Sequence, residues 1–392
     1  MDHFRILQII SSLRRGGAEH HLLNLCRYLA RAGHEPAVCS LSPFEDGLES
    51  AFVAGGIPLY RLPLRSLACL ATPRADRTIR RVMERSGADL LHAHLFHGEV
   101  AGAWMALRTS RPLVVTRHST GLEFSGWRRT AARVYGRRVS RCIAVSDEAA
   151  REAPATGLAS AKVIVLPNAV DTARFRPLEE RERIEPRRAL LAELFPGGVP
   201  RGVVLVGSVG GLKAVKGYSV FMRAAAELLA TGAGDAAPSL RFVIFGDGPE
   251  RESLTALSRG LGLEGVFVLS AQRDELEKIY PLLDLFVLTS FTEGVPLALL
   301  EAMSSGVACA ASSVGGVGGV LEGAGTLVAS GDVAAFAAAI SRLAGDRALR
   351  VEMGRLARVR ILERYNLDIW GHRTLDVYRD ALASRRRLEP AS

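Results

Sequence analysis

The stretch that decides the fold is SFTEGVPLALLEAM, residues 290–303, which follows the fully apolar run Leu285–Leu288. An apolar run without polar alternation is typical of a strand that is covered on both faces, as in a parallel sheet. Proline is favoured in the first turn of a helix, so the sequence predicts a helix that starts at Pro296. Glu293 then lies on the loop and Glu301 near the second helical turn. We expect both carboxylates at the carboxyl end of the strand, where open α/β sheets bind ligands.

The same alternation of strand and helix patterns runs along the whole chain. Short apolar runs alternate with longer amphipathic segments up to about Val170, and the rhythm restarts near Val203 after a polar, proline-bounded stretch. This pattern predicts two Rossmann-like α/β domains. The expected boundaries are residues 1–172 and 201–365 for the domains, 173–200 for a linker and 366–392 for a C-terminal helix.

Composition and charge restrict the class of protein. With 48% apolar and 23% charged residues the chain is globular, and its five scattered cysteines fit a reduced compartment, the cytoplasm. No apolar run approaches the roughly 20 residues of a membrane span. Up to Val170, 23 Lys and Arg stand against 14 Asp and Glu, which accounts for the whole net charge of +9. This half should be attracted to an anionic surface, and phospholipid, a lipid pyrophosphate or nucleic acid would each satisfy that requirement.

A glycine-rich loop follows the first apolar run and leads directly into a helix pattern. Its adjacent residues Gly16 and Gly17 let backbone N–H groups approach a ligand, and a helix start favours phosphate. A tight turn without any ligand explains these residues equally well. The loop lacks the GxGxxG fingerprint, which argues against a nicotinamide dehydrogenase.

The loop and helix around residue 296 suit a sugar diphosphate. One carboxylate can accept hydrogen bonds from two vicinal hydroxyls, as Glu293 or Glu301 would from a sugar or a ribose. The N–H groups around Val295 and Leu297, at the helix start, suit a diphosphate. Spacing alone leaves the alternative that Glu293 caps the helix and Glu301 is solvated.

Glu293 and Glu301 are separated by seven residues, and this spacing resembles the EX7E signature of retaining glycosyltransferases of family 4. Other segments resemble that family in the same order along nearly the whole chain: GGAE at 16–19, HAH at 92–94, VVTRH at 114–118, VSD at 145–147, PNAVD at 167–171, VGGLKAVKG at 209–217 and FGDGP at 245–249. The resemblance implies the GT-B fold, in which two Rossmann-like domains face each other across a cleft. The C-terminal helix is expected to pack back on the N-terminal domain.

The resemblance implies an enzyme that moves a sugar from a nucleotide diphosphate sugar, with a UDP-sugar favoured, to an acceptor with retention of configuration. Cell-envelope polysaccharide or glycolipid synthesis is the expected setting. Lys216 would hold the diphosphate, Glu301 the ribose and Glu293 the sugar hydroxyls, while His118 would approach the sugar from the N-terminal domain. His118 and Glu293 are thus the expected catalytic residues. The expected donor-binding residues are Gly16, Gly17, Lys213, Lys216, Gly246, Val295, Leu297 and Glu301.

Two positions depart from the family pattern. Gly211 stands where the family usually has an arginine beside the diphosphate, and Gly319 stands where a GGxxE segment has its acid. Lys213 could replace the arginine, although a lysine lacks the bidentate fork. Losing a cation beside the leaving diphosphate should raise the reaction barrier. The alternative function is therefore a non-catalytic relative that binds sugar nucleotides or assists an assembly.

No metal is expected, because a lysine and a helix dipole can neutralise a diphosphate and no Asp-x-Asp pair accompanies the phosphate loops.

Arginines cluster in two predicted helices of the N-terminal half, the second of them preceded by Phe124 and Trp127. Such helices suit an anionic membrane surface, although a solvated helix face explains them equally well. The membrane interpretation predicts a peripheral protein with a lipid-linked acceptor, and a saccharide acceptor is the other possibility. Nucleic acid is not expected, because no recognised binding module accompanies the charge.

Overall fold

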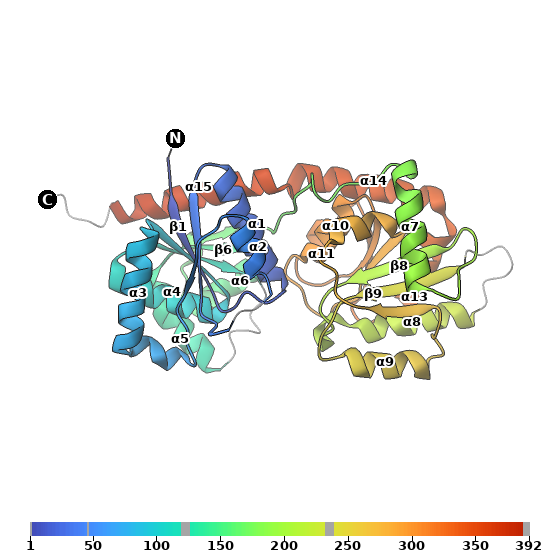
Figure 1. Cartoon of the computed structure of the whole chain (residues 1–392), viewed down its shortest axis with the longest axis horizontal. Helices are drawn as coiled ribbons and strands as arrows, with labels where there is room; N and C mark the ends of the chain where they lie inside the picture. The colour runs from blue at the N-terminus through green and yellow to red at the C-terminus, as the bar shows by residue number, and fades with distance from the viewer. Residues whose placement is uncertain (1, 45–46, 119–125, 232–238, 387–392) are drawn as a thin grey trace. The chain divides into compact units, whose positions relative to one another are not determined.

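The computed structural model describes residues 2–44, 47–118, 126–231 and 239–386, and the chain divides into two compact units (Figure 1). Unit 1 comprises Met1–Ala169 and Leu367–Ser392, and unit 2 comprises Val170–Asn366. The stretch 173–200, expected as a linker, contains helix α7 (Glu180–Leu194). Its residues Leu190, Leu191 and Leu194 pack in a core cluster of unit 2.

Unit 1 is built on a parallel sheet with the strand order β3-β2-β1-β4-β5-β6-β7. The strands are β1 (Arg5–Ile10), β2 (Glu35–Ser40), β3 (Leu59–Arg61), β4 (Leu90–His94), β5 (Leu113–Arg117), β6 (Val139–Ala144) and β7 (Val163–Val165). The order reverses between β1 and β4, which pair directly. Ligands of open α/β sheets bind beyond the carboxyl ends of the strands at such a reversal.

The helices of unit 1 cover both faces of its sheet (Figure 1). They are α1 (Gly17–Arg31), α2 (Glu49–Ala54), α3 (Pro73–Ser86), α4 (Leu95–Thr109), α5 (Trp127–Tyr135), α6 (Asp147–Glu152) and α15 (Leu367–Arg386). Successive side chains of a strand point to opposite faces. Accordingly, Ile6 of β1 packs with α1 and α15, whereas Leu7 and Ile9 pack with α3 and α4.

The C-terminal helix α15 packs on unit 1, as the sequence predicted. Trp370 and Tyr378, which an isolated helix would expose, are 4% and 0% exposed. The helix approaches α1 so closely at Gly371 that a Cβ atom there would lie 2.2 Å from the ring of Tyr28. Residues from the two ends of the chain therefore share one core.

Unit 2 contains a second parallel sheet, with the order β10-β9-β8-β11-β12-β13. Its strands are β8 (Val204–Val209), β9 (Leu240–Phe245), β10 (Phe267–Ser270), β11 (Leu285–Leu288), β12 (Ala308–Ser312) and β13 (Thr326–Val328). Its helices, besides α7, are α8 (Tyr218–Ala230), α9 (Arg251–Gly260), α10 (Leu276–Ile279), α11 (Leu297–Ser304), α12 (Val317–Leu321), α13 (Val333–Gly345) and α14 (Arg347–Arg364). Its order reverses between β8 and β11. Both units thus have the doubly wound architecture that the sequence predicted.

Candidate active site

The loops at the strand reversal of unit 2 pack backbone against backbone. A Cβ atom on Gly246, after β9, would lie 2.0 Å from the carbonyl oxygen of Gly210, after β8. A Cβ atom on Gly315, after β12, would lie 1.8 Å from the carbonyl oxygen of Glu293, after β11. Only glycine fits at such distances. Close packing of these loops therefore accounts for Gly246, and it holds the Glu293 loop in place.

The structure joins two of the predicted site residues of unit 2 in an ion pair. Lys216 ends the short 3-10 helix η6 (Ala214–Lys216) after β8, and Glu293 lies between β11 and α11. Lys216 Nζ lies 2.6 Å from Glu293 Oε1, and the two side chains are 26% and 10% exposed. Ser290 Oγ donates a second hydrogen bond of 2.7 Å to the same oxygen. A cation and a carboxylate thus stand side by side, partly shielded from water, at the carboxyl ends of β8 and β11.

Glu301 lies in the second turn of α11, as predicted, although the helix begins at Leu297 and Pro296 is the residue before it. The buried hydroxyl of Tyr280 donates to Glu301 Oε2 at 2.9 Å. Burial raises the pKa of Glu301 to about 7, while the Tyr280 bond and the charge of Arg174 partly oppose that shift. This carboxyl group therefore changes its charge near neutral pH.

The side chains around the start of α11 are buried. The side chains of Val295 and Leu297 are 4% and 9% exposed and belong to the core of unit 2. Their burial fixes the direction of the helix start. Any contact of these two residues with a diphosphate would have to come from their main chain.

The two positions that depart from the family pattern both have room for a side chain. A Cβ atom on Gly211 would have Asp247 O and Lys213 Cε as its nearest neighbours, both at 3.8 Å. The stem of Lys213 therefore runs beside the place of the missing arginine. A Cβ atom on Gly319 would meet no neighbour within 4 Å. The carbonyl of Gly319 accepts hydrogen bonds from Arg360 at 2.6 Å and from Tyr365 at 3.2 Å.

In unit 1 the predicted glycine loop leads from β1 into α1. Gly16 precedes the first helical residue, and a Cβ atom there would lie 2.5 Å from Glu19 Oε2. Gly17 is exposed, with nothing within 4 Å of a Cβ position. Gly16 is thus covered by a side chain of its own helix, whereas Gly17 is open to solvent at this helix start.

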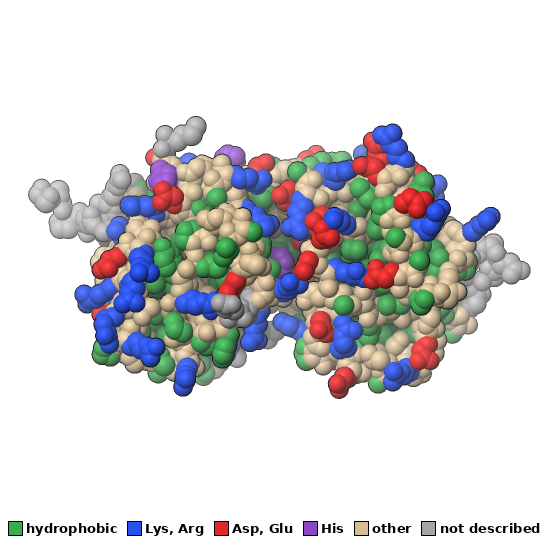
Figure 2. Space-filling view, in the orientation of Figure 1, with side chains coloured by type: hydrophobic (Ala, Val, Ile, Leu, Met, Phe, Trp, Pro, Cys, Tyr) green, Lys and Arg blue, Asp and Glu red, His purple; other side chains and the backbone are tan. Residues whose placement is uncertain are grey.

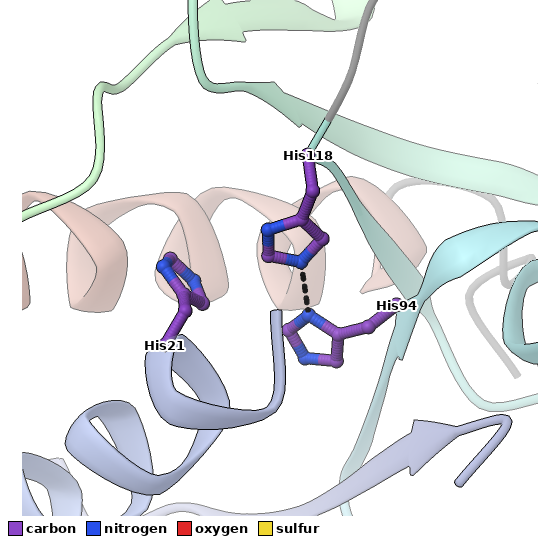
Figure 3. A group of neighbouring side chains, drawn as sticks. All are labelled: His21, His94 and His118. Atoms are coloured by element: carbon purple, nitrogen blue, oxygen red, sulfur yellow. Dashed lines mark hydrogen bonds between the residues drawn. The ribbon is translucent and has the colours of Figure 1, made fainter. Parts of the chain in front are cut away.

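His118 follows β5 and belongs to a cluster with His21 of α1 and His94 of β4, shown in Figure 3. His94 Nδ1 and His118 Nε2 are hydrogen-bonded at 3.1 Å. The His21 ring meets the His118 ring edge-on, with the ring centres 4.8 Å apart. His21 and His94 are buried, and His118 is partly buried. The sequence motifs included His94 and His118, whereas His21 was not predicted.

A chain of hydrogen bonds extends this cluster into the core of unit 1. Gln8 Nε2 donates to the hydroxyl of Tyr378 at 3.3 Å, and this hydroxyl contacts His92 Nδ1 at 2.7 Å. Gln8 Oε1 therefore has to accept from His94 Nε2, at 2.8 Å. A neutral imidazole carries one proton, so His94 Nδ1 accepts and His118 Nε2 donates in the next bond. The chain fixes the tautomer of His118.

Burial is the largest cause that lowers the pKa values of the three clustered histidines and of His92. The pKa of His21 falls to about 4, with an interaction between its ring and the Asn168 side chain opposing the shift. The pKa values of His92, His94 and His118 fall well below the usual value, and the neighbouring imidazoles lower them further. The cluster is therefore neutral at physiological pH.

A cavity of about 350 Å³ opens beside the same edge of the unit 1 sheet. Apolar residues of the segments after β2 and β3 form much of its wall. Arg14, Arg65 and His97 lie on its lining together with four serines, Ser11, Ser12, Ser42 and Ser66. Its hydroxyl, guanidinium and imidazole groups suit a polyhydroxylated or anionic molecule. Ser11, Ser12 and Arg14 belong to the glycine-rich loop that the sequence indicated, whereas the other polar lining residues come from separate segments that no sequence motif included.

Two family models match the chain: Glycosyltransferase Family 4 over residues 15–174, and Glycosyl transferases group 1 over residues 203–346. The D-inositol 3-phosphate glycosyltransferase of Acidothermus cellulolyticus is 30% identical, over 98% of this chain and 90% of that protein. The UDP-Gal:alpha-D-GlcNAc-diphosphoundecaprenol alpha-1,3-galactosyltransferase of Escherichia coli is 24% identical, over 89% of each chain.

The fold matches that of Anabaena HepE, whose crystal structure contains UDP and glucose. The TM-score is 0.79 at 21% identity, and the match covers 96% of this chain and 99% of that one. Two doubly wound units, two adjacent family models and full-length similarity agree. The chain belongs to glycosyltransferase family 4 and is a glycosyltransferase with the GT-B fold.

Proposed function

We propose that this glycosyltransferase transfers a hexosyl or N-acetylhexosaminyl group from a UDP-sugar to an acceptor, with retention of anomeric configuration. The observation that carries the proposal is the ion pair between Lys216 and Glu293, at the strand reversal of unit 2, beside the helix that carries Glu301. A cation, a helix start and two carboxylates are the groups that a nucleoside diphosphate sugar requires. The UDP and glucose bound to Anabaena HepE support this donor class.

Each residue has a distinct role in the proposal. Lys216 places its ammonium group on the diphosphate, and the main chain around Val295 and Leu297 adds the partial positive charge of a helix start. Glu301 accepts hydrogen bonds from the ribose hydroxyls. Because Lys216 already contacts Glu293, a bound donor would place the lysine between the phosphate and the carboxylate. Glu293 then lies close to the sugar that the phosphate carries.

In the proposed reaction, the bond between the anomeric carbon and the diphosphate oxygen breaks, and the acceptor oxygen bonds to the same face of that carbon. The acceptor proton passes to the departing phosphate oxygen. Lys216 stabilises the charge that grows on the diphosphate. His118 contacts the sugar, where the ring and main chain of this residue support the developing oxocarbenium ion. We propose that no metal takes part, because Lys216, Lys213 and the helix start supply the positive charge.

The acceptor belongs to unit 1 in this proposal. The cavity lined by Arg14, Arg65 and His97 suits a hydroxyl-rich acceptor that carries a phosphate or diphosphate. The two relatives described above are named for inositol 3-phosphate and for a diphosphoundecaprenol-linked sugar. A lipid-linked or saccharide acceptor, used in polysaccharide or glycolipid synthesis, is consistent with both.

We further propose that unit 1 binds the cytoplasmic face of an anionic membrane. Figure 2 shows Lys and Arg side chains gathered over α3. The exposed arginines of this helix are Arg74, Arg77, Arg80, Arg81 and Arg85. On α5, Trp127 and Val134 are 63% and 70% exposed beside Arg129 and Arg133. Phe124 lies outside the described residues. Among the described residues, none of the helices is both long and apolar enough to span a bilayer.

The donor is tested by incubating the protein with UDP-, GDP- and ADP-sugars, with and without candidate acceptors, in the presence of EDTA. The expected result is acceptor-dependent release of UDP and a product that keeps the donor's anomeric configuration, as seen by proton NMR. An inverted product would contradict the mechanism. Nucleotide binding without any release would favour a non-catalytic relative, the alternative that Gly211 and Gly319 suggested.

The membrane contact is tested by co-sedimentation with vesicles. Binding to vesicles that contain phosphatidylglycerol, but not to pure phosphatidylcholine, is expected, and it should weaken as salt is raised. Arg77→Ser with Arg81→Ser should weaken binding. Arg355→Ser with Arg347→Ser, on the exposed surface of α14 in unit 2, is the matched control. Equal binding to both kinds of vesicle would contradict the proposal.

A further inference from the structure

The three histidines of unit 1 have an arrangement that a hydrogen-bond network alone does not explain. His21, His94 and His118 each present a ring nitrogen to a common space, and these three nitrogens lie within 4.8 Å of one another. The rings come from three elements, α1, β4 and the segment after β5, and they converge as Figure 3 shows. Three imidazoles on separate elements form the ligand set of many zinc sites that keep one position open.

His21 supplies the second observation. Its Nε2 is buried, and no hydrogen-bond partner for this atom exists among the residues that the structure describes. The side chain of Asn168 also interacts with the His21 ring and raises its pKa. A buried nitrogen without a partner is costly, and an ion or water that fills the space removes the cost. The Nε2 atom has a lone pair when Nδ1 carries the ring proton.

The neighbours of the cluster have the arrangement that supports metal ligands. A metal-binding histidine usually donates its other ring N–H to an oxygen, which fixes the ring and its tautomer. His94 makes this contact from Nε2 to Gln8 Oε1 at 2.8 Å, which directs the Nδ1 lone pair toward His118. Gln8 is itself held by Tyr378.

We propose that His21 Nε2, His94 Nδ1 and His118 Nε2 form a binding site for Zn²⁺, with a fourth position open to water. The ion replaces the proton between His94 and His118, and that proton moves to His118 Nδ1, so no net proton is released. Tetrahedral Zn–N bonds of about 2.0–2.1 Å place ligand nitrogens about 3.3 Å apart. The distance of 3.1 Å between His94 Nδ1 and His118 Nε2 already satisfies this requirement. The distances from these two atoms to the His21 nitrogen are at most 4.8 Å, so they have to shorten by about 1.5 Å at most, which ring rotation can provide.

Occupation of this site has a consequence for transfer that rests on the proposed role of His118. A bound Zn²⁺ takes the His118 ring away from the donor sugar, and the ion therefore inhibits reversibly. The donor chemistry itself stays metal-independent in this scheme. Zinc binding and zinc inhibition are separate measurements, so a failure of the proposed transferase activity would leave the binding result intact.

Binding is measured on protein without a purification tag, treated with EDTA and then freed of it. Equilibrium dialysis against Zn²⁺ at pH 7.5 is expected to leave close to one ion per chain. Co²⁺ should give the visible absorption bands of a tetrahedral site, and Mg²⁺ should not bind there, since imidazole prefers zinc and cobalt. Wild-type protein that retains no stoichiometric zinc would overturn the proposal whatever the variants do.

The variant His21→Phe keeps a ring against Trp370 and removes the nitrogen. It should weaken zinc binding by roughly tenfold or more. His372→Phe also loses one histidine, on the exposed surface of α15, and should bind like the wild type. In transfer assays zinc should inhibit wild type and His372→Phe, EDTA should restore both, and His21→Phe should resist inhibition. Equal zinc affinity in a folded His21→Phe protein would place the ion elsewhere and contradict the site.

Discussion

The strands of unit 2 have the same order as the first six strands of unit 1, and both units place polar residues at the strand reversal, yet the chemistry of the two places differs. At the reversal of unit 2, an ammonium group and a carboxylate form an ion pair whose side chains are 26% and 10% exposed. At the reversal of unit 1, Gln8, His92 and His94 are fully buried and neutral. Topology thus selects the place, and the side chains select what binds there.

The ion pair of unit 2 and the neutral network of unit 1 should also respond differently to a ligand. The ammonium group of Lys216 is still partly hydrated, so it can exchange Glu293 for a diphosphate. Burying this ammonium group fully would have cost more desolvation free energy. The buried network of unit 1 contains no paired charge that a diphosphate could take over, and its hydrogen bonds instead fix the tautomer of His118. We therefore expect substitutions in unit 2 to act on donor chemistry and substitutions in unit 1 to act first on stability.

The largest effect is expected for Glu293→Gln in unit 2. The neutral amide cannot form an ion pair with Lys216, and its oxygen accepts hydrogen bonds from sugar hydroxyls more weakly than a carboxylate does. Turnover should therefore fall by roughly 10²- to 10³-fold. UDP should bind at least as tightly as before, because Lys216 is released from its partner. Turnover is followed by UDP release, and binding by thermal shift. Glu252→Gln, on the surface helix α9, is the control. Loss of UDP binding in Glu293→Gln would assign this carboxylate to the nucleotide and contradict its proposed role.

A second prediction uses the pKa of Glu301, raised to about 7 by burial. If the ionised carboxylate holds the ribose, the dissociation constant of UDP-glucose should rise about tenfold between pH 8 and pH 6. UDP-glucose is the suitable ligand, because its diphosphate does not titrate in this range. Calorimetry at several pH values measures the effect. Glu301→Gln should bind weakly with no such pH dependence, and a wild-type affinity that is constant over this range would exclude the ribose assignment.

The same group gives a prediction of opposite sign for stability. The folded state holds the Glu301 proton more tightly than the unfolded chain, whose carboxyl has the usual value of 4.5. Its contribution to stability is therefore fully present below pH 4.5 and is lost as pH rises through about 7. Nucleotide binding and folding thus make opposite demands on the charge of one carboxyl group.

The two units also differ in how far the sequence predicted them. The site of unit 2 is local: one loop and one helix carry Glu293 and Glu301, and the predicted helix start at Pro296 was wrong by a single residue. The network of unit 1 joins Gln8 to Tyr378 across 370 positions. No spacing along the chain predicts such a contact. His21 and Tyr378 also lie on helix faces dominated by apolar residues, where a polar side chain gives no separate signal.

Helix α7 was missed for a different reason. Its first half is almost entirely charged and contains Pro186, which has no N–H group for the helical hydrogen bond. A capping box between Glu179 and Glu182 starts the helix, and Arg183 and Arg187 bind Asp284, which immediately precedes β11. Tertiary ion pairs, which sequence patterns do not show, stabilise this segment.

A fourth prediction tests the buried network of unit 1. Tyr378→Phe removes the hydroxyl that connects Gln8 with His92, and leaves both without their partner in the core. The free energy of unfolding should fall by about 1–3 kcal/mol. Tyr60→Phe, at a partly exposed position of the same unit, should change it by less than about 0.5 kcal/mol. Denaturant unfolding measures both. An unchanged stability in Tyr378→Phe would show that the network is not formed in solution.

The smallest effect, and the sharpest test of the charge difference between the units, is expected at Gly211. The position has a backbone that accepts a side chain, with the nearest atoms 3.8 Å from a Cβ. An arginine there would add a second cation beside Lys213 and Lys216. A partly exposed pair of this kind is worth about 0.5–1 kcal/mol, so Gly211→Arg should raise turnover about two- to fivefold. Gly211→Gln, similar in size but uncharged, should not. Equal rates in both variants would mean that the diphosphate lies away from the β8 loop, and the role of Lys216 would then have to be assigned to another residue.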